Sequence, residues 1–170
     1  MRYIGIDPGM GGAVAHLDDR GFVGVFDMPL NQEKDFLDVY GLYELLHGPV
    51  TTICLEAVTP MGTDGRGSLG RFMTVYGAIR ALAEFTTSEL VLVRPYDWKR
   101  ALGLVTPTKR GEGIQRTSAE RASYKRAAKE ASMEMARELY PETSPYLRRK
   151  KDHDRAEAIL LAHYLRVRKQ

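Results

Sequence analysis

Two carboxylate residues, Asp7 and Glu56, each stand at the end of a short apolar run. Residues 2–7 are rich in β-branched and aromatic side chains, and the Pro-Gly pair that follows ends the run, since Pro lacks an amide hydrogen and Gly permits a turn. Residues 50–56 form a similar run that ends on Glu56. Both acids are therefore expected at strand tips. Asp is also common at the first position of a turn, which leaves a purely structural role open for Asp7.

A second pair of acids, Asp154 and Glu157, opens the last apolar helical segment of the chain. Residues three apart share one helix face, so both side chains are expected in the first turn on the same side. The same spacing is also that of a capping box, in which the two side chains bond the amide groups of their own helix. The neighbouring Asp152 and His153 have no assigned role, although His153 is a further possible ligand or base.

Four acids in one site require a cation, because carboxylates brought close together raise one another's pKa. Oxygen ligands without cysteine favour Mg²⁺, for which Mn²⁺ can substitute, over Zn²⁺. Two such ions about 4 Å apart support phosphodiester hydrolysis. The single cysteine, Cys54, lies within an apolar run and is expected to be a small core residue.

The strands and helices that must position these acids are predicted from the periodicity of hydrophobic residues and from the Pro and Gly residues that interrupt it. Three strands, at residues 2–7, 12–17 and 22–28, form an antiparallel meander, and two more are expected at 50–56 and 90–93. A helix capped by Asp38 precedes the fourth strand.

Further helices are expected at 68–84, 96–102, 118–139 and 154–167. The helix from Ser68 contains two glycines, which cost about 1 kcal/mol each against Ala and indicate close packing against the sheet or a partner. The long helix opens with a Thr117–Glu120 capping box and is expected to turn Tyr124 inward, together with Ala128, Ala131 and Met135. Residues 104–118 lack periodicity and are expected to form a mobile basic loop.

Composition places the chain among single-domain proteins that do not span a membrane. It has 170 residues, 44% of them hydrophobic, and no apolar run approaches the roughly 20 residues that cross a bilayer. The N-terminus leads straight into a strand without a signal peptide, so the cytoplasm is the expected location.

Charge is divided unevenly along the chain. Residues 1–93 carry 6 Lys and Arg against 12 Asp and Glu, a net charge of −6, whereas residues 94–170 carry 19 against 10, a net charge of +9. A polyanion such as DNA is a natural partner for the basic half, although a solvated basic surface explains the same numbers. The residues expected to bind phosphates are Lys99, Arg100, Lys125, Lys129, Arg148, Arg149, Lys150 and Lys151.

Several motifs together resemble the RuvC family of Holliday-junction resolvases in its phage-type branch. The motifs are Gly-Ile-Asp-Pro-Gly at 5–9, the strand ending at Glu56, Pro-x-x-Trp-Lys at 95–99, and Asp-x-x-Glu at 154–157. The resemblance covers nearly the whole chain. It implies an α/β, RNase H-like fold, in which a five-stranded mixed sheet of meander and parallel strands is flanked by helices.

The resemblance also implies a function. Asp7, Glu56, Asp154 and Glu157 correspond to the family's Mg²⁺ ligands, and family members are usually homodimers that nick opposed strands of four-way junctions in bacterial or phage-infected cells. Two departures are visible: bacterial members usually end the last pair with Asp, where this chain has Glu157, and no aromatic side chain follows Glu56 closely. The alternatives are an RNase H-like nuclease acting on flaps or RNA–DNA hybrids, or a nucleic-acid-binding module without catalysis. An actin-like ATPase is disfavoured, since that fold needs two such halves.

Overall fold

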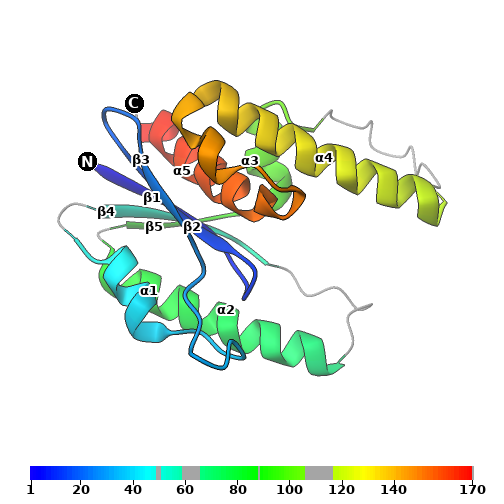
Figure 1. Ribbon diagram of the computed structural model, residues 1–170. Helices are drawn as coiled ribbons and strands as arrows, with labels where there is room; N and C mark the ends of the chain where they lie inside the picture. The colour runs from blue at the N-terminus through cyan, green and yellow to red at the C-terminus, as the bar shows by residue number, and fades with distance from the viewer. Residues whose placement is uncertain (49–50, 59–65, 88, 106–116, 170) are drawn as a thin grey trace.

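A five-stranded mixed sheet forms the centre of the molecule, with helices on both faces (Figure 1). The computed structural model describes residues 1–48, 51–58, 66–87, 89–105 and 117–169. The strands are β1 (Arg2–Asp7), β2 (Ala13–Asp18), β3 (Phe22–Asp27), β4 (Thr51–Glu56) and β5 (Glu89–Val93). Their spatial order is β3-β2-β1-β4-β5, with the first three antiparallel and β1, β4 and β5 parallel. The predicted fold class is confirmed.

Helices cover the sheet in two layers. The larger layer contains α3 (Pro95–Ala101), α4 (Ser118–Leu139) and α5 (His153–Lys169), and the other contains α1 (Val39–Leu46) and α2 (Arg66–Thr86). Two short 3-10 helices, η1 (Pro141–Tyr146) and η2 (Lys150–Asp152), connect α4 to α5. The central strand β1 is buried on both sides, because Tyr3 packs into the α5 layer while Ile4 and Ile6 pack into the α1 and α2 layer.

Gly5 sets how closely α5 approaches the sheet. A Cβ atom at this position would lie 2.0 Å from the Ala158 carbonyl oxygen and 2.4 Å from the Ala162 nitrogen. Glycine therefore lets the helix backbone rest directly on β1. This contact brings the first turn of α5 to the end of β1, two residues after Gly5.

A tight turn follows Asp7. Gly9 has a φ of +125°, which favours glycine, and a Cβ at Gly12 would lie 2.1 Å from the Asp7 carbonyl oxygen. The Gly12 amide donates to the Gly9 carbonyl at 3.1 Å and closes the turn. Glycine at these positions allows the chain to reverse immediately behind the Asp7 carboxyl group.

The sequence placed the strands correctly to within one residue among the described residues, but two helices differ from expectation. Helix α2 begins at Arg66, so Ser68 lies inside the helix and does not cap it, and its buried face includes Val75 and Ile79. In α4 the Thr117–Glu120 capping box is present. The inward prediction for Tyr124 is wrong: its exposed fraction is 50%.

The reason for the α4 difference lies in how far the helix extends. Its C-terminal half packs against α5 through Ser132, Met133 and Ala136, while its N-terminal half projects beyond the sheet (Figure 1). A periodic pattern identifies a helix face but not how much of the helix has a neighbour. Of the other three residues expected inward, Ala131 and Met135 in the C-terminal half and Ala128 just before it are partly buried.

Cys54 is fully buried on β4, and burial raises the pKa of its thiol to about 12, in agreement with a core role. The expected basic loop lies largely outside the described residues; within it, Leu104 packs against the α5 layer and Ser118 already belongs to α4. Among the described residues no helix has the length and apolar character needed to cross a bilayer.

Candidate active site

Asp7 and Glu56 stand side by side at one edge of the sheet. Strands β1 and β4 are parallel neighbours, with Ile6 paired to Leu55, so the next residue of each strand is a carboxylate. Neighbouring parallel strands end at the same edge of a sheet. This register places Asp7 beside Glu56, as expected for the two acids at the strand tips.

Asp154 and Glu157 reach the same edge from the first turn of α5. Burial and nearby charge raise the pKa of Asp7 well above its usual value: desolvation is the largest cause, followed by the negative charges of Glu157, Glu56 and Asp154. Each of the other three acids is thus close enough to Asp7 to perturb its ionisation. The structure brings all four predicted ligands together.

Asp154 and Glu157 do not form a capping box, because α5 begins at His153 and Asp154 already lies inside the helix. Capping of the preceding turn is carried out by Asp152, which accepts the Arg149 amide at 2.8 Å and the Arg149 guanidinium at 2.8 Å. Burial alone would raise the pKa of Asp152, but these bonds from Arg149 outweigh it and lower the pKa. Asp152, whose role the sequence left open, is therefore a structural anchor, and the side chains of Asp154 and Glu157 face other partners.

Helix α3 supplies donors to two of the acids. The indole Nε1 of Trp98 donates to Glu56 Oε2 at 2.7 Å, and Lys99 Nζ donates to Glu157 Oε1 at 2.8 Å. Burial raises the pKa of Glu56, with the Glu157 charge adding to it, while Trp98 and Lys99 oppose the rise. Lys99, one of the residues expected to bind phosphates, is 23% exposed and is paired with Glu157. It therefore belongs to the carboxylate centre, the cluster formed by Asp7, Glu56, Asp154 and Glu157.

Asp154 has its own set of partners. His153 Nε2 lies 2.8 Å from Asp154 Oδ1, and the other ring nitrogen of His153 lies 3.1 Å from the Lys150 carbonyl oxygen. Burial raises the pKa of Asp154; the charges of His153 and Lys129 and a side-chain hydrogen bond with Asp7 oppose this rise.

The chemistry of this donor set fits a hard divalent cation. Its ligand atoms are carboxylate oxygens, and the pKa of Asp7 is raised first by burial and then by the charges of the three other acids, which Lys99 offsets only in part. In the described part of the chain, no three His, Cys, Asp or Glu side chains are spaced to hold a metal ion as they stand, so the four acids are neighbours without yet forming a complete ligand set. The polar side-chain atoms that contact the four carboxylates belong to Trp98, Lys99 and His153. The side chains of Lys99 and His153 can rotate away from the acids.

A hollow of about 530 Å³ opens beside Asp154. It runs between the turn at Gly11 and Gly12, the loop containing Lys34, and η2. Arg155 fixes one wall by a bidentate ion pair with Asp27, at 2.6 and 2.7 Å. Of the four acids, Asp154 alone lines this hollow, so the hollow reaches the carboxylate cluster on its Asp154 side.

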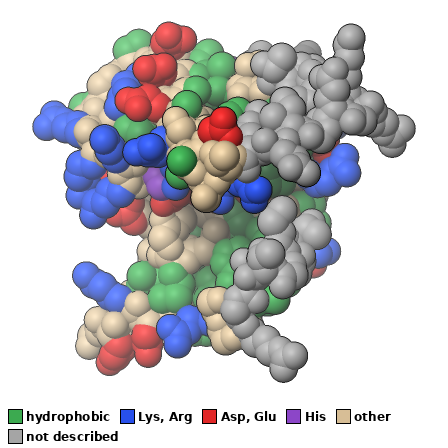
Figure 2. Space-filling view, turned by 90° about the vertical axis from the view of Figure 1, so that its right-hand side faces the viewer, with side chains coloured by type: hydrophobic (Ala, Val, Ile, Leu, Met, Phe, Trp, Pro, Cys, Tyr) green, Lys and Arg blue, Asp and Glu red, His purple; other side chains and the backbone are tan. Residues whose placement is uncertain are grey.

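A second groove, of about 300 Å³, lies between α4 and the segment that joins η1 to η2. Its lining contains five cations and one acid: Arg126, Lys129, Arg137, Arg148, Lys150 and Glu130. None of these cations is in an ion pair with another described residue. Figure 2 shows most of the Lys and Arg side chains on the upper half of the face in view.

Apart from Lys99, which is paired with Glu157, the predicted phosphate-binding residues divide into three groups. Lys129, Arg148 and Lys150 line the basic groove, and Lys129 is close enough to Asp154 to affect its pKa. Lys151 lines the hollow with Arg149, whose guanidinium is paired with Asp152. Arg100 and Lys125 are exposed elsewhere on α3 and α4.

Sequence reasoning missed Arg126 and Arg137 in the groove, and Lys34 in the hollow. Arg126, Lys129, Met133 and Arg137 recur every three or four residues and share one helix face, so this signal was present in the sequence. Lys34 comes from a loop after β3, and no local pattern links it to α5. The hydrogen bond from Trp98 to Glu56 was also not expected from the sequence.

Comparison with known proteins bears on the fold. RuvC from Thermus thermophilus superimposes with a TM-score of 0.53 and 17% sequence identity, over 99% of this chain and 97% of that chain. Seventeen chains of solved structure match. No family model and no curated protein match the sequence. At this identity the likeness establishes a RuvC-like, RNase H-like fold.

Proposed function

We propose that this protein is a metal-dependent endonuclease that resolves Holliday junctions and other branched DNA. The observation that carries the proposal is the convergence of Asp7, Glu56, Asp154 and Glu157, from β1, β4 and α5, at one reachable edge of the sheet. The RuvC-like fold supports the same activity, because the matched structure is that of a RuvC protein and the sequence motifs resemble the RuvC family. Membership of the phage-type branch and a cytoplasmic location are parts of the proposal that rest on the sequence.

The four carboxylates would hold Mg²⁺, with Mn²⁺ as a substitute. When bound, a pair of such ions activates water and stabilises the leaving oxygen of a phosphodiester. Residues around the four acids support this site: Trp98 donates a hydrogen bond to Glu56, Arg155 pairs with Asp27 beside the first turn of α5, and Lys99 offsets the charge of Glu157. In-line hydrolysis would leave a 5′-phosphate and a 3′-hydroxyl, which a ligase can seal.

The basic groove would bind the phosphate backbone of the DNA. It contains cations without carboxylate partners among the described residues, and Lys129 connects it electrostatically to Asp154. Phosphate contacts position a nucleic acid but carry no base sequence. The groove therefore supports a structure-specific rather than a sequence-specific mode of binding.

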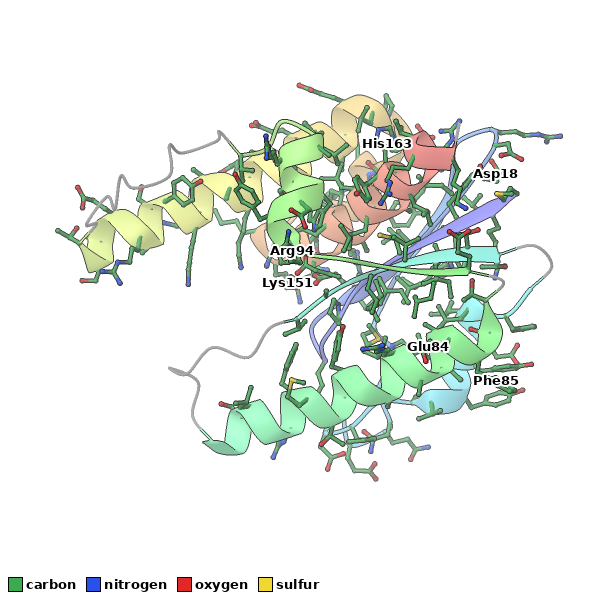
Figure 3. The ribbon with its side chains drawn as sticks, turned by 180° about the vertical axis from the view of Figure 1, so that it is seen from behind. Asp18, Glu84, Phe85, Arg94, Lys151 and His163 are labelled. Atoms are coloured by element: carbon green, nitrogen blue, oxygen red, sulfur yellow. The ribbon has the colours of Figure 1, made fainter. Side chains whose placement is uncertain are left out.

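A symmetric homodimer would supply the two active sites that two opposed nicks require. The two helix glycines do not pack against the sheet: Cβ atoms built on Gly70 and Gly77 meet nothing within 4 Å among the described residues. They lie on an exposed face of α2, and Phe85, labelled near the C-terminal end of this helix in Figure 3, is 81% exposed. These features support α2 as the dimer contact.

The experiment that tests the proposal compares DNA structures of one sequence. Purified protein with Mg²⁺ is incubated with a four-way junction, a three-way junction, a linear duplex, a flap and an RNA–DNA hybrid, and products are ligated afterwards. Preferential, paired nicking of the four-way junction with sealable ends is the expected result. Equal cleavage of linear duplex or hybrid would identify a general RNase H-like nuclease, and binding without cleavage would identify a non-catalytic module.

A further inference from the structure

Trp98 is buried directly against the carboxylate centre. Its side chain has an exposed fraction of 0% and packs in the apolar layer between the sheet and α5. Its only polar atom, Nε1, donates to Glu56 Oε2 at 2.7 Å. An indole N–H can only donate, so this bond fixes one carboxylate oxygen and holds the other, Oε1, in a defined direction.

The neighbouring residue extends the same arrangement. Lys99 Nζ lies 4.9 Å from the centre of the Trp98 ring and 2.8 Å from Glu157 Oε1. Helix α3 thus presents two donors, side by side, to acids from β4 and from α5. Because the Trp98 ring is locked in the core, it is the rigid member of this pair, whereas Lys99 has a flexible stem.

We propose that Trp98 is a positioning residue that orients the Glu56 carboxylate for the divalent cation. This inference rests on the proposed function of the site. Donors that hold a metal-ligating carboxylate by its second oxygen fix the direction of the ligand, and removal of such a donor typically weakens metal binding about 10- to 100-fold. Trp98 acts through Glu56, and its own atoms are not required to touch DNA or metal.

The chain offers a direct test because Trp98 is its single tryptophan. Growth of a tryptophan auxotroph on 3-benzothienylalanine replaces the indole N–H by sulfur at this position alone and preserves the ring shape. Growth on 5-fluorotryptophan gives a matched control that keeps the N–H donor. Neither replacement leaves the cavity that Trp98→Phe would create.

Two quantities separate orientation of Glu56 from general packing. Calorimetric titration with Mn²⁺, without DNA, should show about 10-fold weaker binding in the benzothienyl protein than in the fluorotryptophan protein. The Mg²⁺ concentration for half-maximal junction cleavage should rise by a similar factor. The melting temperature without metal and junction binding in EDTA should agree between the two proteins.

A Glu56→Gln background provides a second variant. There the carboxylate is already absent, so exchange of the ring should change Mn²⁺ binding no further. Equal Mn²⁺ affinity of the two ring-exchanged proteins when Glu56 is intact would overturn the role of Trp98 and leave the metal site standing. Failure of the fluorotryptophan protein to bind Mn²⁺ at all would overturn the proposed metal site, and the role of Trp98 with it.

Discussion

Lys99 and Glu157 form an ion pair within the carboxylate centre, with 2.8 Å between Nζ and Oε1. Both side chains are largely buried, at 23% and 13% exposure. The pair decides between the two sequence interpretations of Glu157, because its carboxylate faces the other acids rather than the amide groups of its own helix. It also shows where positive charge is needed when the four acids meet.

Glu157→Gln should therefore remove catalysis with little loss of stability. Gln keeps the shape of the side chain but not its charge, and a capping role would predict normal activity with a loss of at most about 1 kcal/mol. Cleavage rates at saturating Mg²⁺ and thermal melts measure both effects. Glu134→Gln, at an exposed position of α4 outside the basic groove, is the matched control. Activity near that of the unaltered protein in Glu157→Gln would return this residue to a structural role.

Asp7→Asn should abolish cleavage, leave junction binding intact and raise the melting temperature without metal. The folded-state pKa of Asp7 is raised, so ionised Asp7 opposes folding, and this cost grows as pH rises above the pKa of the unfolded chain until it passes the folded pKa. The stability gain of Asp7→Asn should accordingly be larger at pH 8 than at pH 5. Gel-shift binding and melts at the two pH values test it. A variant that cuts at the normal rate would remove Asp7 from the site.

Lys129→Gln should weaken junction binding and lower its salt dependence. Removing one phosphate contact reduces the slope of log K against log salt concentration by about one. Arg126→Gln and Arg137→Gln should behave alike if the groove binds one stretch of backbone. Arg20→Gln, at the exposed turn between β2 and β3, is the control. An unchanged slope in all three groove variants would leave the groove as ordinary solvated surface.

His16 should make the protein acid-sensitive. Burial and the charge of Arg2 lower the pKa of the His16 imidazole from 6.5 to about 4, and a hydrogen bond with the Leu45 backbone opposes this change only in part. Between pH 6.5 and pH 4 the imidazole is therefore protonated in the unfolded chain but neutral in the folded chain. The free energy of unfolding decreases as the pH falls through this range. This loss is about 3 kcal/mol for one such group.

His16→Gln removes the titrating group and keeps a polar side chain. The difference in unfolding free energy between pH 7 and pH 4 should shrink by a few kcal/mol relative to the unaltered protein, as measured by urea denaturation at each pH. Equal pH dependence in both proteins would show that His16 is protonated in the folded state.

Gly77→Gln should stabilise the isolated subunit but weaken the proposed dimer. The position faces open space within the described chain, and glycine in a helix interior costs about 1 kcal/mol against a good helix former. A larger side chain would nevertheless separate two closely packed α2 helices. Sedimentation velocity with and without junction measures the association. Ala127→Gln on exposed α4 is the control, and unaltered dimerisation of Gly77→Gln would place the contact elsewhere.

Local signals in the sequence determined much of the fold. Apolar runs ended by Pro and Gly placed Asp7 at the tip of β1, Asp38 and Thr117 capped their helices as expected, and the meander followed from three short runs. These features depend on backbone preferences within a few residues, so a single sequence carries them. The sequence thus showed that both strands end on an acid, whereas the parallel pairing of β1 and β4, which places Asp7 beside Glu56, comes from the order of strands in the sheet.

Only the tertiary structure decided which partner each side chain meets. Thr117 with Glu120 and Asp154 with Glu157 have the same spacing, yet the first pair caps a helix and the second joins Asp7, because α5 rests on β1 at Gly5. Lys99 lies in the carboxylate centre because Trp98 is buried in the core and places α3 beside Glu56. Such choices depend on contacts between residues far apart in the chain, where periodicity and capping rules carry no information.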